Sequence, residues 1–228
     1  MTERTARDLA ARRGVETNVY QPAEDSGLLA DAIEKRGRGR LLEVGTGSGW
    51  VAARAAREVP DVSSVVASDL SPHACRAARR RAVEGGPEEA GVSDSTGDRT
   101  EPDGSGSLFD VVRANLVSPF ADDAFDTVAF NPPYLPTDPE NEWDDWMERA
   151  LSGGESGQEL IDPFLEAVGR VLAPGGVGLL LVSSLTGYDA VLDRVDACGF
   201  DHEVVVEESY PFESLSVLAL TATGGSSQ

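Results

Sequence analysis

Short runs of apolar residues alternate along the chain with segments in which apolar residues recur every three or four positions. The runs predict buried strands, and the segments predict amphipathic helices. We expect strands at 41–44, 62–67, 109–112, 125–130, 177–183, 204–207 and 215–220, and helices at 22–36, 50–58, 72–84, 160–172 and 188–197. Strands that alternate with helices are typical of an α/β protein with an open, mostly parallel sheet.

Three stretches depart from this alternation. Residues 1–18 have no sustained apolar period, and we interpret them as a flexible N-terminal arm; residues 223–228 form a short tail. Residues 85–107 are almost entirely Gly, Pro, Ser, Thr, Asp and Glu. Because structureless loops of this length are uncommon inside compact domains, we interpret this stretch as a disordered insertion or a plain spacer. A single domain then spans residues 19–222.

The charge of the chain is strongly negative and unevenly distributed. The 228 residues include 40 Asp and Glu against 19 Lys and Arg, a net charge of -21. Residues 82–228 hold 29 of the acidic residues and only 5 basic ones. Such a surface repels nucleic-acid phosphates, so no nucleic-acid partner is expected. It also suits a salt-rich cytoplasm, and this halophilic interpretation is compatible with an acidic surface made for a basic partner.

The counts of Cys and His, and the lengths of the apolar runs, narrow the classes of protein that remain possible. The chain has 2 Cys and 2 His, which excludes a disulfide framework and leaves too few ligands for a zinc site, so no metal is expected. No apolar run approaches the roughly 20 residues of a membrane span, and the N-terminus lacks a signal-peptide core. We therefore expect a cytoplasmic protein with no membrane contact.

A glycine-rich turn from Glu43 to Gly49 follows the first predicted strand and opens a helix. Its spacing is Gly-x-Gly-x-Gly, whereas dinucleotide sites use Gly-x-Gly-x-x-Gly to bind a pyrophosphate. Glu43 at the strand end favours a cationic ligand, and S-adenosylmethionine carries an ammonium and a sulfonium. Asp69 closes the second strand, where an acidic residue binds ribose hydroxyls; the alternative is a helix cap.

A second motif, Asn131-Pro132-Pro133-Tyr134, follows the strand predicted at 125–130. Amide and aromatic amine nitrogens are hard to methylate because their lone pairs are delocalised. An asparagine carbonyl and a fixed main-chain carbonyl can accept from one NH2 group, which orients it and enriches electron density on nitrogen. The prolines stiffen the turn, and the ring of Tyr134 offers a face to a planar group. The alternative is a plain proline-rich turn with no catalytic role.

With these motifs the chain resembles the HemK-like amino-methyltransferases, most closely the eukaryotic and archaeal branch that methylates class I release factors. Val19 to Ser26 looks like the N-terminal signature of that branch, and the stretches 153–157, 161–165 and 213–218 look like its later motifs. The resemblance implies a seven-stranded, Rossmann-like class I fold with helices on both faces and strand order 3-2-1-4-5-7-6. It also implies N5-methylation of the glutamine in a Gly-Gly-Gln loop, with S-adenosyl-L-methionine as cofactor.

The resemblance further implies roles for individual residues. The cofactor-binding candidates are Ser26, Glu43, Gly45, Gly47, Gly49, Asp69, Asn115, Leu116 and Asn131. The substrate-binding candidates are Asn131, Pro132, Pro133 and Tyr134, of which Asn131, Pro132 and Tyr134 are the catalytic candidates. Asn115 departs from the aspartate common in the family, but its amide can still bond an adenine ring.

A partner subunit is also implied. Leu108 to Val112 is the edge strand in this topology and lacks the proline or lysine that usually protects an edge. In the resembling branch a small zinc-binding activator adds a strand there, so we expect a heterodimer. Competing functions are adenine-N6 methylation of DNA or RNA, which uses the same tetrapeptide, protein-lysine methylation at the acidic stretch 138–148, and a non-catalytic cofactor-binding regulator.

Overall fold

The structure is a computed structural model that describes residues 22–84, 108–134 and 157–223. The predictions made for residues 1–18, 85–107, 138–148 and 153–156, and for the tail after residue 223, lie outside these ranges. No helix in the described part of the chain is long and apolar enough to cross a membrane.

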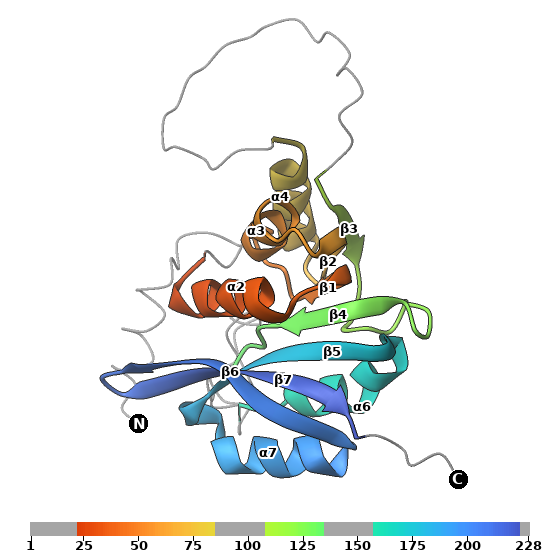
Figure 1. Ribbon diagram of the computed structural model, residues 1–228. Helices are drawn as coiled ribbons and strands as arrows, with labels where there is room; N and C mark the ends of the chain where they lie inside the picture. Colours follow the sequence, from red (N-terminus) through yellow and green to blue (C-terminus); the bar gives the residue numbers. More distant parts are fainter. Residues whose placement is uncertain (1–21, 85–107, 135–156, 224–228) are drawn as a thin grey trace, which may run out of the picture.

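The core of the fold is one seven-stranded sheet with strand order β3-β2-β1-β4-β5-β7-β6 (Figure 1). The first five strands run parallel, and β7 is antiparallel to both of its neighbours. This confirms the predicted fold class and strand order. The strands are β1 (Gly39–Val44), β2 (Val62–Asp69), β3 (Asp110–Arg113), β4 (Phe125–Phe130), β5 (Leu172–Ser183), β6 (Phe200–Tyr210) and β7 (Glu213–Ala222).

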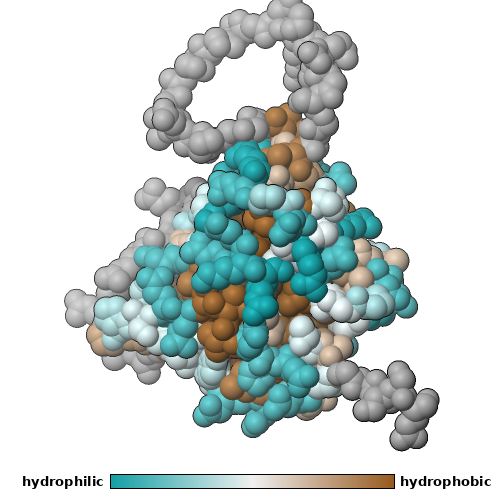
Figure 2. All heavy atoms as spheres, in the orientation of Figure 1, coloured by the Kyte–Doolittle hydropathy of each residue, from teal (hydrophilic) through white to brown (hydrophobic). Residues whose placement is uncertain are grey.

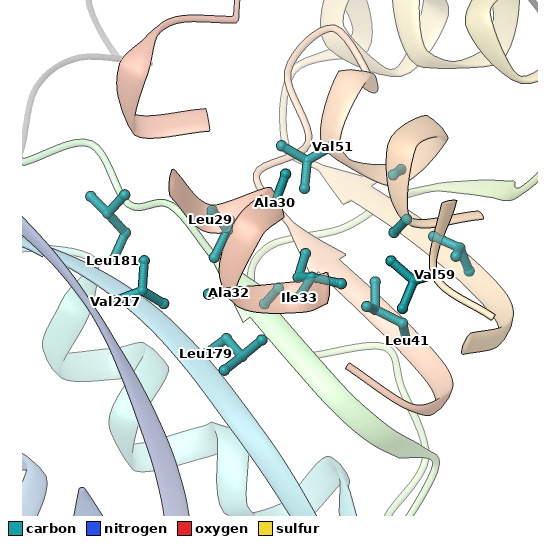
Figure 3. Packing of buried hydrophobic residues seen from close by; sticks show 14 of the residues in the cluster. Leu29, Ala30, Ala32, Ile33, Leu41, Val51, Val59, Leu179, Leu181 and Val217 are labelled. Carbon is teal, nitrogen blue, oxygen red and sulfur yellow. The ribbon is translucent and has the colours of Figure 1, made fainter. Parts of the chain in front are cut away.

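Helices cover both faces of this sheet, as predicted. They are α2 (Glu24–Arg36), α3 (Trp50–Glu58), α4 (Pro72–Glu84), α6 (Ile161–Val171) and α7 (Tyr188–Ala197), with a 3-10 turn η2 (Ser184–Thr186). Side chains alternate along β1, so Leu41 packs with α2 and α3 while Leu42 packs with α6 and α7. Figure 3 shows Leu29 and Ile33 of α2 pointing onto the first face, toward Leu41 and Leu179.

Five strands are longer than the apolar pattern predicts, β5 and β6 by the most. β6 runs over Phe200–Tyr210 rather than 204–207, because most of its side chains are exposed and carry no apolar signal. Main-chain pairing with β7 along its whole length defines it instead. β5 begins at Leu172, directly after α6, and a register shift opposite Phe125 and Thr127 accommodates the residues before Val177.

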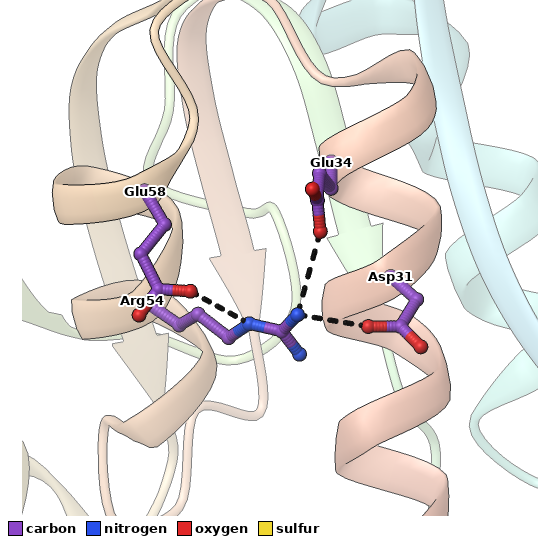
Figure 4. A network of polar contacts seen from close by, with 4 residues as sticks. All are labelled: Asp31, Glu34, Arg54 and Glu58. Carbon is purple, nitrogen blue, oxygen red and sulfur yellow. Dashed lines mark hydrogen bonds and ion pairs between the residues drawn. The ribbon is translucent and has the colours of Figure 1, made fainter.

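An ion-pair network fastens α2 to α3 (Figure 4). Arg54 of α3 contacts Asp31 at 2.9 Å, Glu34 at 3.4 Å and Glu58 at 3.0 Å. Partial burial by itself would lower the pKa of Arg54, but the surrounding carboxylates outweigh it and the net pKa is raised. The network fixes α2 against α3, the helix that follows the glycine turn.

Candidate active site

The carboxyl ends of β1, β2 and β4 meet at one edge of the sheet. Val44 lies opposite Ser68 of β2 and Phe130 of β4, so the segments that follow these strands start side by side. The glycine turn, Asp69 and the Asn131 turn are therefore brought together, at the edge where parallel α/β sheets bind ligands.

The glycine turn depends on backbone that only glycine adopts readily. Gly45, Gly47 and Gly49 have φ values of 67°, 54° and 77°, all in the left-handed region. A Cβ on Gly49 would lie 2.9 Å from Cα of Ala78, so this position also lets α4 pack closely. A Cβ on Gly45 would lie 3.9 Å from the main-chain oxygen of Asn131. The turn thus lies directly beside the second motif.

Glu43 anchors the glycine turn from within the sheet. Its side chain is buried, and Oε2 accepts hydrogen bonds from Oγ1 of Thr46 at 2.6 Å and from the main-chain N–H of Ala52 at 2.9 Å. Burial raises the pKa of the Glu43 carboxyl to about 8, with a smaller contribution from the charge of Asp69. The structure therefore gives Glu43 a positioning role, and its contact with a cationic ligand stays a prediction.

Asp69 joins the second strand to the glycine turn. Its Oδ2 accepts the N–H of Gly47 at 2.9 Å, and its Oδ1 accepts the N–H of Ser71 at 2.8 Å. The helix cap is Ser71 rather than Asp69, because the Ser71 hydroxyl accepts the N–H of His73 at 3.2 Å. Burial raises the pKa of Asp69. Each carboxylate oxygen accepts more than one hydrogen bond, so Asp69 can still receive ribose hydroxyls.

The segment after β3 packs against the same edge. The N–H of Ala114 donates to the main-chain oxygen of Asp69 at 3.0 Å, which places Asn115 next in the chain to that contact. Asn115 is exposed, and Leu116 has a φ of 48° and packs partly against the second face. The sequence alone did not single out Leu70, which is 48% exposed beside Asp69. An exposed leucine next to a carboxylate suits an adenosine, which combines an apolar ring with hydroxyls.

Ser26 lies apart from these contacts within the described residues. It is buried in the first turn of α2, where its N–H donates to Oδ1 of Asp25 at 2.6 Å and its hydroxyl lies 3.4 Å from the same oxygen. Its proposed contact with the cofactor stays a prediction.

The Asn131 turn contains an unsatisfied polar atom. Oδ1 of Asn131 is buried and has no hydrogen-bond partner among the described residues. A buried unpaired oxygen costs roughly 1–3 kcal/mol, so such atoms call for an explanation. An amide donor arriving from a substrate would satisfy it. Pro132 is buried and Pro133 half-buried beside it.

Tyr134 has a different environment from the one its sequence position suggested. It is only 3% exposed and belongs to the apolar cluster formed with α2 and α3. Its ring therefore anchors the turn in the core. A role in stacking on a planar substrate group stays a prediction.

Ser183, Thr186 and Glu213 form a buried group of hydrogen-bonded side chains at the end of β5, which we call the polar relay. The hydroxyl of Ser183 donates to Oε1 of Glu213 at 2.8 Å and accepts the N–H of Leu185 at 3.1 Å. Thr186 donates from its hydroxyl to the main-chain oxygen of Ser183 at 2.6 Å.

Gly157 lies between this relay and the tetrapeptide. A Cβ on Gly157 would lie 3.0 Å from Cγ2 of Thr186 and 2.7 Å from the main-chain oxygen of Tyr134. Residues far apart in sequence thus lie beside the substrate side of the site. Gly157 and Glu213 fall within the stretches 153–157 and 213–218 that the resemblance singled out, whereas no sequence motif marked Ser183 or Thr186.

Known proteins match this chain over most of its length. The family model described as a methyltransferase domain matches residues 41–129. A protein of Methanocaldococcus jannaschii named for protein N5-glutamine methyltransferase activity is 32% identical over 200 residues, covering 88% of this chain and 90% of its own. The human methyltransferase HEMK2 is 29% identical, covering 92% of each chain.

A solved structure agrees in fold. The E. cuniculi Mtq2–Trm112 complex, described as responsible for the methylation of the eRF1 termination factor, contains a chain that superposes with a TM-score of 0.64. It is 24% identical and covers 90% of this chain and 99% of its own. The relative from Methanocaldococcus jannaschii, at 32% identity over most of both chains, identifies the family. The chain therefore belongs to the HemK-like protein N5-glutamine methyltransferases, class I enzymes that use S-adenosylmethionine.

Proposed function

We propose that the enzyme transfers a methyl group to N5 of the glutamine in the Gly-Gly-Gln loop of a class I translation release factor. The observation that carries this proposal is the buried Oδ1 of Asn131, which has no partner among the described residues and lies beside Gly45 of the cofactor turn. Its chemistry fits the N–H of a primary amide. Relatives named for glutamine methylation, and a structural neighbour described as acting on eRF1, support the choice of substrate.

The chain's own residues would work by positioning. When held by the glycine turn and Asp69, S-adenosylmethionine would supply an electrophilic methyl group, and the bond from that methyl to sulfur would break as the methyl moves to nitrogen. Oδ1 of Asn131 would accept one N–H of the glutamine amide, and a main-chain carbonyl of the turn would accept the other. This arrangement fixes the amide nitrogen and raises its electron density as the new N–C bond forms; the nitrogen then releases one proton to solvent. Buried Pro132 and Tyr134 would keep the turn from shifting during the reaction.

The proposal extends to a partner subunit. Among the described residues, β3 is an edge strand of the sheet and pairs only with β2. An unpaired strand edge invites another chain to add a strand. The neighbour from E. cuniculi is a complex with Trm112, and we propose a small activator of that kind on the 108–112 edge, carrying its own zinc. Val111→Lys should then reduce co-purification with the activator, and the lone chain should be poorly soluble or weakly active.

A radiolabelled transfer assay tests the substrate. Purified enzyme, alone and with its activator, is incubated with labelled S-adenosylmethionine and a class I release factor, at about 2 M KCl because the acidic surface suits high salt. A release factor with its loop glutamine changed to alanine is the matched control. We expect label only in the wild-type factor. Equal labelling of both, or label in DNA, RNA or lysine-containing peptides instead, would reject the proposal.

A further inference from the structure

The outer face of α4 and the end of β3 carry a group of exposed arginines. Arg76, Arg79 and Arg80 lie on α4, and Arg113 is the last residue of β3. We call these four residues the arginine patch. Figure 2 shows hydrophilic surface over α3 and α4, with an apolar spot where α4 ends.

The patch is not neutralised by the rest of the described chain. Arg36, Arg54, Arg170 and Arg194 each form an ion pair with a carboxylate. Within residues 22–84, 108–134 and 157–223, none of the four patch arginines has a carboxylate within ion-pair distance. Arg76 and Arg80, one turn apart, also repel each other.

Three of the patch arginines contact groups other than carboxylates. Nη2 of Arg76 lies 3.0 Å from Nδ1 of His73. Arg113 donates to the main-chain oxygen of Leu70 at 2.9 Å, and Arg79 reaches the main-chain oxygen of Val111 at 3.4 Å. The contacts of Arg79 and Arg113 hold these two side chains at the β3 edge without cancelling their charge. A ligand that supplies carboxylates would do so.

Apolar side chains border the patch. Val83 of α4 is 78% exposed, and Leu70 is 48% exposed. A surface that combines exposed arginines, exposed aliphatic side chains and an unpaired strand edge matches the composition of a protein interface. Single-stranded nucleic acid would instead need aromatic side chains for base stacking. The exposed residues of the patch and its border include no Phe, Tyr or Trp.

We propose that the arginine patch binds an acidic face of the subunit that adds its strand to β3. This inference rests on the partner proposed above and states the chemistry of its contact surface. Arginine can bond a carboxylate through two parallel N–H groups. Such direct contacts persist at high salt, where long-range attraction is screened beyond roughly 3 Å at 1 M. The edge strand sets the register, and the arginines select an acidic partner.

Charge reversal tests the inference. In Arg76→Glu/Arg80→Glu, affinity for the co-purified small subunit, measured by calorimetry at about 1 M KCl, should fall at least about tenfold. Lys35→Glu/Arg57→Glu is the matched control, since it makes the same charge change at exposed positions on α2 and α3. Its affinity should stay within about twofold of wild type. If the charge-reversal variant misfolds, the uncharged double variant Arg76→Gln/Arg80→Gln takes its place. Its thermal unfolding midpoint shows whether it is folded.

Three results would overturn the inference. One is equal affinity in the patch and control variants, and another is absence of any wild-type complex with the subunit. The third is loss of single-stranded RNA binding in the patch variant with subunit affinity unchanged. The methyl-transfer assay on the release factor scores the proposed reaction separately, so failure of the patch and failure of the reaction are distinguishable.

Discussion

The two halves of the active-site edge are built differently. On the cofactor side, the carboxylates of Glu43 and Asp69 each accept hydrogen bonds from the chain itself. On the substrate side, Oδ1 of Asn131 is buried without a described partner. The cofactor half is thus largely completed by the fold, whereas the substrate half keeps one acceptor free.

This difference suggests that cofactor and substrate contribute differently to completing the site. A preorganised cofactor half holds its turn in shape before anything binds. An unpaired acceptor on the substrate half carries a cost in the free enzyme that a primary amide would remove. We therefore expect variants of the two halves to separate cofactor affinity from turnover.

The largest effect is expected at Asn131. Asn131→Ala removes the free acceptor and should lower kcat by a factor on the order of 10²–10³, as losing one preorganised hydrogen-bonding group does. Steady-state assays with the release factor measure this change. A turnover within a few-fold of wild type would show that the substrate half does not depend on this oxygen.

The glycine turn should give the next largest effect. Gly49→Ala places a methyl group 2.9 Å from Ala78 at a φ of 77°, and we expect it to cost about 1–3 kcal/mol of unfolding free energy and about tenfold in cofactor affinity. Gly175→Ala is the control, with a φ of 76° and open space around it. Denaturant titration should show a smaller loss there; equal losses would mean that close packing at Gly49 is unimportant.

The pH dependence of cofactor binding tests Glu43. In the free protein its pKa is raised to about 8, so the carboxyl is largely protonated near neutral pH. A cationic ligand favours the charged form, so affinity should rise with pH up to about 8, by at most about tenfold per unit, with proton release. Calorimetry in buffers of different ionisation enthalpy measures this.

Glu43→Gln is the control for that titration. It should show a flat affinity profile with no proton release, while Glu58→Gln on the surface should behave as wild type. Stability should respond with the opposite sign. Since the folded pKa lies above the ordinary 4.5, the unfolding free energy of the wild type should decline relative to Glu43→Gln as pH rises toward about 8. A steeper affinity profile in Glu43→Gln than in wild type would contradict this assignment.

The smallest effect is expected in the relay behind the tetrapeptide. Ser183→Ala removes the donor to Glu213 and the acceptor for Leu185, and should lower kcat several-fold with little change in cofactor affinity. Ser209→Ala, at an exposed contact with Ser214, should leave kcat unchanged. If Ser183→Ala lowered the thermal stability but not kcat, the relay would support the fold and not the Asn131 turn.

Local patterns were enough to predict the alternation of strands and helices and the two motifs, because each glycine and proline there constrains its own backbone. The strand order came from the family resemblance. Contacts between distant segments were beyond reach. The partners of Glu43 include Ala52 in the next helix, and Ser183 meets Glu213 across 30 positions. The extent of β6 depended on pairing with β7, and the exposure of Leu70 depended on how three strand ends meet.

The central claim is that Asn131 serves the substrate and that the cofactor half functions without it, against the cofactor-binding role that the family resemblance implies for this residue. Calorimetric titration of S-adenosylhomocysteine into Asn131→Ala and Asp69→Ala tests it directly. We predict a dissociation constant within about twofold of wild type for Asn131→Ala and at least about tenfold weaker binding for Asp69→Ala. Weakening of similar size in both variants, or in Asn131→Ala alone, would contradict the division of the site.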